Sequence, residues 1–84
     1  MFLELYSIRD AKAEAYGNPF TQKTKGEALR SFMTAVNDPK TTLHQYPEDF
    51  DLYQIGTWND QNGKIDHLET PKHLAKAIEY VENQ

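Results

Sequence analysis

The stretch from residue 46 to residue 63 reads YPEDFDLYQIGTWNDQNG, and it predicts a strand followed by the turn of a hairpin. Residues 49–58 are rich in the aromatic and branched aliphatic side chains that favour strands. Asn62 and Gly63 then supply residue types that tolerate the positive φ angles of a tight turn. Because residues 64–68 return as a second strand, this stretch predicts an antiparallel hairpin that turns at residues 60–63.

The residues before the hairpin predict one strand and one helix. Residues 2–9 carry apolar side chains on both faces, which favours a central position in a sheet. Residues 11–16 alternate small and polar side chains, which favours a strand, while their alanines favour a helix, so both remain open. Thr24 and Glu27 have the spacing of a capping box, which predicts a helix over residues 25–37. Its apolar stripe consists of Leu29, Phe32, Met33 and Val36.

A second helix is predicted after the hairpin. Thr70 and Pro71 indicate its start, because proline loses no hydrogen bond at the first position of a helix, and it extends over residues 71–82. The order of elements is then β-α-β-β-α. A right-handed crossover, with the return strand of the hairpin beside the first strand, predicts an α+β fold with a truncated ferredoxin-like antiparallel sheet and two helices on one face.

Length and composition fit a single small domain over residues 1–84. The chain has no cysteine, which excludes disulfides and thiolate metal sites and favours a reducing cytoplasm. Hydrophobic residues make up 38% of the chain and form no run near the roughly 20 residues that cross a bilayer. The N-terminal residues also lack the basic and hydrophobic regions of a signal peptide, so we expect neither export nor membrane insertion.

The charge is unevenly distributed along the chain. The net charge is −4, but residues 1–40 hold six Lys/Arg against five Asp/Glu, and residues 41–84 hold three against eight. Composition alone favours an ordinary acidic domain, because nucleic-acid-binding surfaces are usually more basic. The basic side chains of the first half are Arg9, Lys12, Lys23, Lys25, Arg30 and Lys40.

Metal and catalytic sites are not indicated. Residues 58–69 approach the pattern of a calcium-binding loop, but Trp58 stands at the first ligand position and Pro71 lies where the exiting helix should run. The three histidines have no ligand spacing, and no nucleophile, phosphate loop or carboxylate pair is recognisable. We therefore expect no metal, no cofactor and no enzymatic activity.

Aromatic residues provide the stronger functional signal, at 12% of the chain. A ring near a strand or turn can stack on an unpaired base while neighbouring cations contact phosphate. The alternative is that a thin sheet uses its aromatic residues as core, which is favoured for Phe20, Tyr53 and Trp58. The candidate nucleic-acid-binding residues are Arg9, Lys12, Tyr16, Phe20, Lys23 and Arg30.

Four blocks of sequence carry a family resemblance. They are YSIRDxKA at residues 6–13, PF at 19–20, ALRxF at 28–32 and YPEDFxLYxIGT at 46–57, followed by Gly63. This ordered set resembles the small non-structural protein of gokushoviruses, which are Microviridae phages with single-stranded DNA genomes. The resemblance spans nearly the whole chain, and the YPEDFxLYxIG block is its most specific part.

The resemblance implies a protein that is made in the infected bacterium and is absent from the virion. It implies DNA binding, or a role in the switch from duplex replication to single-stranded genome synthesis or packaging, and it supplies no catalytic residues. Arg9, Lys12, Phe20 and Arg30 match the family's motif positions and suit DNA. The acidic hairpin departs from what a simple DNA-coating protein would show.

Two functions are therefore expected in the host cytoplasm. The first is a non-enzymatic accessory protein that associates with single-stranded DNA through a basic and aromatic face. The second is a protein-interaction adaptor that contacts the replication initiator or a host factor through its acidic hairpin and sheet edge. A homodimer is also expected, because an open face and an unprotected edge can be covered by a second copy.

Overall fold

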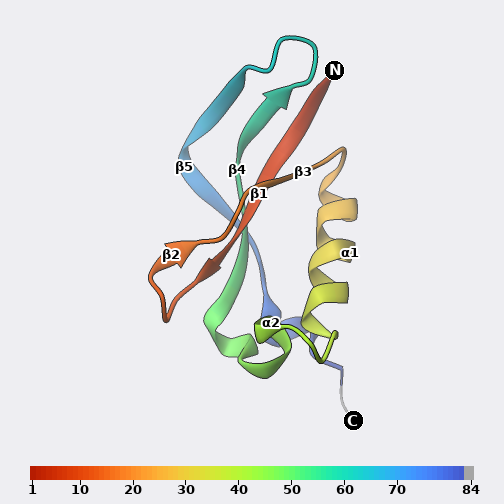
Figure 1. Ribbon diagram of the computed structural model, residues 1–84, viewed down its shortest axis with the longest axis vertical. Helices are drawn as coiled ribbons and strands as arrows, with labels where there is room; N and C mark the ends of the chain where they lie inside the picture. The colour runs from red at the N-terminus through yellow and green to blue at the C-terminus, as the bar shows by residue number, and fades with distance from the viewer. Residues whose placement is uncertain (83–84) are drawn as a thin grey trace.

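The computed structural model describes residues 1–82, and it has an antiparallel sheet with one long helix packed on it (Figure 1). The strand order is β2-β1-β4-β5, and β3 also pairs with β1. The α+β class predicted from the sequence is confirmed. The strands are β1 (Phe2–Asp10), β2 (Ala15–Tyr16), β3 (Phe20–Gln22), β4 (Phe50–Asn59) and β5 (Ile65–Lys76). The helices are α1 (Lys25–Val36) and the short α2 (Thr42–Gln45), with 3-10 turns at Pro47–Asp49 and Ala77–Tyr80.

The central hairpin forms where the sequence predicts it. Gly63 adopts a φ of 77°, and its amide donates to the Asn59 carbonyl at 2.7 Å to close the turn between β4 and β5. The Asn59 and Asn62 side chains accept further turn amides. The Asp60 carboxylate forms an ion pair with the Met1 amine at 3.0 Å. These asparagines therefore act as turn formers.

Helix α1 begins at the predicted capping residue. The Thr24 hydroxyl accepts a hydrogen bond from the Glu27 amide at 3.1 Å. The face that packs on the sheet consists of Ala28, Phe32 and Val36, whereas Met33 is 42% exposed. The buried stripe is rotated from the predicted one, because a single helix on a sheet buries a narrow row at i, i+4 and i+8.

The predicted helix over residues 71–82 is wrong. Strand β5 continues to Lys76, and a 3-10 turn follows at Ala77–Tyr80. The ten residues of β4 offer a long ladder, and its pairing outweighs the helix propensity of this segment. Pro71 lies where the ladder skips from Lys72 to His67, so its missing amide removes no ladder hydrogen bond.

The predicted ferredoxin-like strand order is also wrong. Strand β4, not the return strand, lies beside β1, and it is antiparallel to it over its whole length. The reason is the short strand β3, which pairs antiparallel with β1 and delivers the chain to the Glu4 end of the sheet. Helix α1 then leads back to the Asp10 end, so β4 starts opposite Asp10 and must be antiparallel to β1.

The conflict over residues 11–16 is resolved as a turn followed by a strand. Residues 11–14 form the turn, in which Glu14 has a φ of 55°, and β2 then pairs with the end of β1. Strand β1 thereby has neighbours on both sides, as its two apolar faces predict.

One face of the sheet packs against α1 and forms the core. Its largest members are Tyr6, Phe32 and Leu52, all essentially inaccessible to solvent. The Tyr6 hydroxyl donates to the Glu4 carboxylate, and burial, together with that carboxylate, raises the pKa of Tyr6 above its ordinary value. The hairpin end of the sheet extends beyond α1 in Figure 1, and no helix within residues 1–82 covers the face opposite α1. No helix within residues 1–82 has the length and apolar character needed to span a membrane.

Candidate nucleic-acid interface

Three aromatic rings form a row across the sheet on the face opposite α1. They belong to Tyr16 on β2, Tyr53 on β4 and His73 on β5, and we call them the aromatic row. The rings of Tyr16 and Tyr53 meet edge to face with centroids 5.5 Å apart, and those of Tyr53 and His73 do so at 5.3 Å. Because Leu52 points into the core, its neighbour Tyr53 points to the open face.

The junction of β1 and β2 positions the first ring of the row. Ser7 lies opposite Tyr53 in the ladder, is buried, and donates from its hydroxyl to the Gly17 carbonyl at 2.8 Å. The Gly17 amide donates in turn to the Ile8 carbonyl at 2.8 Å. A Cβ at Gly17 would lie only 3.3 Å from that carbonyl oxygen, so the close approach of the two strands favours glycine here. These contacts hold Tyr16 beside Tyr53.

Two charged side chains beside the aromatic row, Arg9 and Asp51, are register partners on β1 and β4. The Arg9 guanidinium lies 5.9 Å from the centroid of the Tyr16 ring, within range of a cation–π interaction. On β4, opposite Arg9, the Asp51 carboxylate lies 2.8 Å from Nε2 of His73. Protonation of His73 turns this hydrogen bond into an ion pair. The aromatic row is therefore bordered by a cation and a carboxylate on adjacent strands, and the carboxylate holds His73.

The structure brings only some of the sequence-predicted residues together. Arg9 and Tyr16 belong to one surface, and Lys12 lies on the exposed turn that joins β1 to β2. Phe20 lies on the other side of the sheet, where its ring stacks on Tyr6 with centroids 5.9 Å apart. Lys23 precedes α1 and Arg30 is exposed on it, so neither joins the aromatic row.

Sequence reasoning missed two members of the row. The sequence favoured Tyr53 as core, although its i, i+2 spacing from Asp51 places the two on one face of a strand. His73 fell within the incorrectly predicted helix, so no pattern could place it beside Tyr53. For these two residues, the available signal was the spacing of Asp51 and Tyr53.

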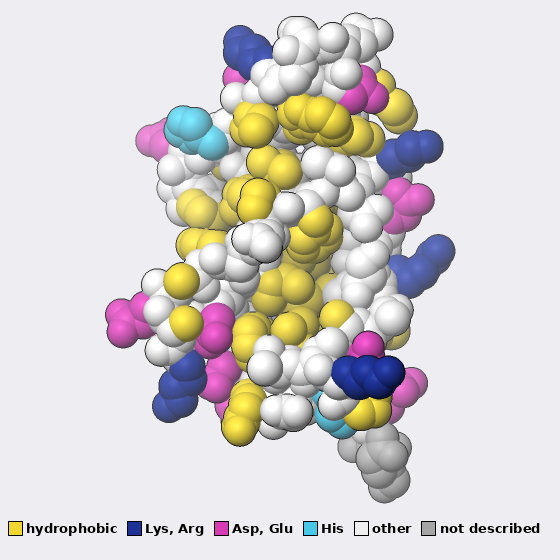
Figure 2. Space-filling view, viewed as in Figure 1, with side chains coloured by type: hydrophobic (Ala, Val, Ile, Leu, Met, Phe, Trp, Pro, Cys, Tyr) yellow, Lys and Arg dark blue, Asp and Glu magenta, His cyan; other side chains and the backbone are white. Residues whose placement is uncertain are grey.

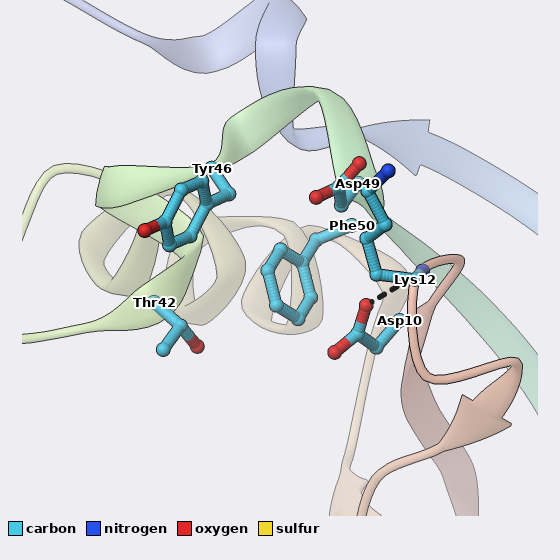
Figure 3. Close-up of a pocket in the computed structure, with 6 residues that line it drawn as sticks. All are labelled: Asp10, Lys12, Thr42, Tyr46, Asp49 and Phe50. Carbon is cyan, nitrogen blue, oxygen red and sulfur yellow. Dashed lines mark hydrogen bonds between the residues drawn. The ribbon is translucent and has the colours of Figure 1, made fainter.

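A pocket of about 400 Å³ opens at the end of β1 and β4 (Figure 3). It is lined by Asp10, Lys12, Thr42, Tyr46, Asp49 and Phe50. A neighbouring cavity of about 410 Å³ shares Asp10 and Phe50 with it and extends to Tyr16 and Phe20. A third, of about 100 Å³, is lined by Arg9, Ala11, Asp49, Asp51 and Tyr53, next to the aromatic row.

Surface charge is mixed. Figure 2 shows hydrophobic side chains along the middle of one view, with Lys and Arg interspersed with Asp and Glu at its margins. Within residues 1–82, no group of three or more His, Cys, Asp or Glu is arranged to hold a metal ion. Near the aromatic row, Arg9 lies over the Tyr16 ring and Lys12 lies on the adjacent exposed turn.

Comparison with known proteins assigns the chain to a family. The family described as Phage ORF5 protein matches residues 3–80, a range that includes the whole aromatic row. Protein ORF5 of Chlamydia phage 1, a gokushovirus, is 41% identical over 69 residues, which cover 77% of this chain and 72% of that protein. No solved structure matches. The resemblance to a gokushovirus protein is thus confirmed, and the chain belongs to the phage ORF5 protein family.

Proposed function

We propose that this protein is a non-enzymatic phage accessory protein that binds single-stranded DNA in the host cytoplasm, during the switch to single-stranded genome synthesis or packaging. The observation that carries the proposal is the aromatic row with Arg9 at its end. Tyr16 is 43% exposed and the His73 side chain is 42% exposed, so both rings offer surface to a ligand. Unpaired bases expose the π faces that such rings stack on, whereas paired bases in a duplex do not.

The charges around the row favour weak and salt-sensitive binding. Arg9 and Lys12 are the cations proposed to contact phosphate, and the net charge of −4 opposes further attraction. For single strands, the logarithm of the binding constant falls with the logarithm of the salt concentration, with a slope of about −0.7 for each phosphate contact. Two contacts therefore give a slope of about −1.4. Stacking supplies about 1–3 kcal/mol per base in such sites.

The surroundings of the row support binding rather than catalysis. Ser7 lies opposite Tyr53 and carries a hydroxyl. This hydroxyl is buried and donates to the Gly17 carbonyl, so it is not available as a nucleophile. Asp51 and His73 interact with each other at the surface, where their side chains are 29% and 42% exposed and water reaches both.

Two observations weigh against the adaptor function. Strand β5 is an edge strand, but its ladder is interrupted between His67 and Lys72, where Pro71 lies, and such interruptions discourage the addition of another strand. In the acidic hairpin, Asp60 pairs with the Met1 amine and Asp66 lies 3.9 Å from the Lys64 ammonium. Part of the hairpin's negative charge is therefore already balanced within the chain.

A homodimer remains part of the proposal, with the hairpin end of the sheet as its contact. Leu3, Trp58 and Ile65 are register partners on three neighbouring strands, and they lie outside the buried core. Ile65 is 59% exposed. Sedimentation equilibrium at high micromolar concentration tests this, and the native protein should have the mass of a dimer. Ile65→Lys should abolish association, and its circular dichroism spectrum should not change.

The test of the function is a titration of labelled oligonucleotides. Oligo(dT) of about 12 nucleotides, short enough to follow one protein surface, should bind, and affinity should fall with added salt at the slope given above. The same sequence in a duplex should bind more weakly. If no oligonucleotide binds at low salt, the DNA-binding function is wrong, and the adaptor function takes its place.

A further inference from the structure

We propose that the pocket at the end of β1 and β4 accepts one unpaired base of the bound strand and prefers guanine. This inference rests on the proposed function and adds sequence preference to it. Figure 3 shows the rings of Tyr46 and Phe50, the carboxylate of Asp10, the Lys12 side chain and the Thr42 hydroxyl around one opening. Its volume of about 400 Å³ lies within the usual range for small-molecule sites.

The aromatic residues provide the surface on which a base can stack. Tyr46 is 53% exposed, so its ring is open to a ligand, whereas Phe50 is 8% exposed and belongs to the floor of the pocket. Tyr46 is the C-terminal cap of α2, and Pro47 follows it at the start of a 3-10 turn, so the backbone that carries this ring is restricted. Pockets that take an extruded base read it by stacking together with hydrogen bonds to its Watson–Crick edge.

Hydrogen-bond acceptors dominate the polar lining. Oδ1 of Asp10 accepts the amides of Lys12 at 2.9 Å and Ala13 at 3.3 Å, which fixes the direction of the carboxylate. The second oxygen of Asp10 accepts neither amide, and Asp49 adds a second carboxylate to the lining of the pocket. A carboxylate accepts hydrogen bonds but donates none when ionised, so it selects a base by its N–H groups.

Among the four bases, guanine fits such acceptors best. Its N1–H and its N2 amino group are adjacent and point the same way, so one can donate to the second oxygen of Asp10 while the other donates to the carboxylate of Asp49. Adenine and cytosine offer one amino group on that edge. Thymine has a single N3–H between two carbonyl oxygens, which would face the carboxylate with like partial charge. The pocket should therefore bind guanine most tightly, adenine and cytosine less tightly, and thymine least.

The pocket is placed so that a strand on the aromatic row can reach it. Asp49 lines both this pocket and the small cavity that contains Arg9 and Tyr53. The Ala11 amide donates to the Asp49 carbonyl at 2.8 Å, so a backbone hydrogen bond fixes the residue that the two openings share. Lys12 lies at the rim, where its ammonium can contact the phosphate of the inserted nucleotide and offset the carboxylate charge.

The test compares oligo(dT) with the same oligomer carrying one central guanine or one central hypoxanthine. A single guanine should raise affinity about tenfold, which is typical of one bidentate base contact. Hypoxanthine lacks the N2 amino group and should lose most of that gain. Asp10→Asn keeps an oxygen for the two backbone amides but loses the charged acceptor, so it should remove the guanine preference while oligo(dT) binding remains. Tyr46→Ala should reduce the same gain.

Glu48→Gln is the matched control, because Glu48 adjoins Asp49 but does not line the pocket, and it should leave the guanine preference unchanged. If oligo(dT) binds and guanine adds nothing, or if Asp10→Asn keeps the full preference, the pocket proposal is overturned and the DNA-binding function stands. If no oligomer binds at low salt but deoxyguanosine monophosphate does, the pocket proposal is supported and the DNA-binding function fails. If neither binds, both are overturned.

Discussion

The rings of Tyr16 and Tyr53 meet edge to face, with centroids 5.5 Å apart, although β1 separates the two strands that carry them. Tyr16 lies opposite Arg9 and Tyr53 lies opposite Ser7, so the two tyrosines are diagonal neighbours across β1. Ser7 is the small residue that lets the rings approach, and its hydroxyl fixes the turn behind Tyr16. A continuous aromatic surface results from two segments that are far apart in the sequence.

The first prediction concerns stacking. Tyr53→Ala should weaken single-stranded DNA binding by about 1–3 kcal/mol, because it removes the central ring of the aromatic row. The salt dependence should not change, since no cation is lost. Fluorescence anisotropy at several salt concentrations measures both quantities. Phe2→Ala is the control, because Phe2 is 65% exposed and lies at the hairpin end of the sheet, and an equal loss of affinity there would contradict a specific role for the row.

The second prediction separates the cations. Arg9→Ala and Lys12→Ala should each lower affinity for all sequences and reduce the salt slope by about 0.7, because each removes one phosphate contact. Arg30→Ala and Lys25→Ala remove the same charge from α1, on the other face of the sheet, and should change little. Four variants with the same slope would mean that binding depends on net charge and not on this surface.

The third prediction tests the contact between β4 and β5. A Cβ at Gly56 would overlap the Asp66 carbonyl oxygen and lie 3.0 Å from the His67 Cα, both part of the backbone. Gly56→Ala should therefore lower the free energy of unfolding by about 1–3 kcal/mol, as overpacking does. Gly26 lies within α1, and a Cβ there would lie 3.9 Å from the Thr24 hydroxyl. Helix propensity therefore predicts that Gly26→Ala raises the free energy of unfolding by up to about 1 kcal/mol. Urea denaturation should give opposite signs for the two variants.

The fourth prediction concerns alkaline pH. Burial and the Glu4 carboxylate raise the pKa of Tyr6 above its ordinary value of 10.0, so the folded state favours the neutral phenol. The stability that this shift contributes is complete below pH 10 and is lost as pH rises above it, because the unfolded chain then releases the proton more readily.

Tyr6→Phe should remove that alkaline loss and should cost about 1 kcal/mol at neutral pH through the missing hydrogen bond to Glu4. Thermal unfolding of both proteins between neutral pH and pH 11 measures the difference. Parallel curves for the two proteins would show that another group is responsible for alkaline unfolding.

The sequence predicts those parts of the fold that local chemistry determines. Asn62 and Gly63 define the turn of the hairpin, and Thr24 defines the start of α1 through its own side chain. Strand β5 beyond Leu68 could not be predicted, because its alanines and lysines favour a helix and only pairing with β4 makes the segment extended. The strand order depends on β3, a strand of three residues with no periodicity to reveal it.

The candidate site was predictable only in part. Arg9 and Tyr16 lie near each other in the sequence, and the β1–β2 turn brings them together. Tyr53 and His73 join them through the ladders β1–β4 and β4–β5, which connect distant segments. The position of Phe20 depends on β3, whose pairing with β1 places the ring against Tyr6. Tertiary pairing, and not residue type, therefore decides which aromatic residues reach the open face.

The measurement that tests the central claim most directly is a titration of the protein with a labelled single-stranded oligonucleotide at two salt concentrations, with the Tyr53→Ala variant measured in parallel. Binding by the native protein at low salt, a slope near −1.4 for the two phosphate contacts, and weaker binding by the variant with the same slope are the predicted results. No binding at low salt, or equal binding by the native protein and the variant, would contradict the claim that the aromatic row is a surface for single-stranded DNA.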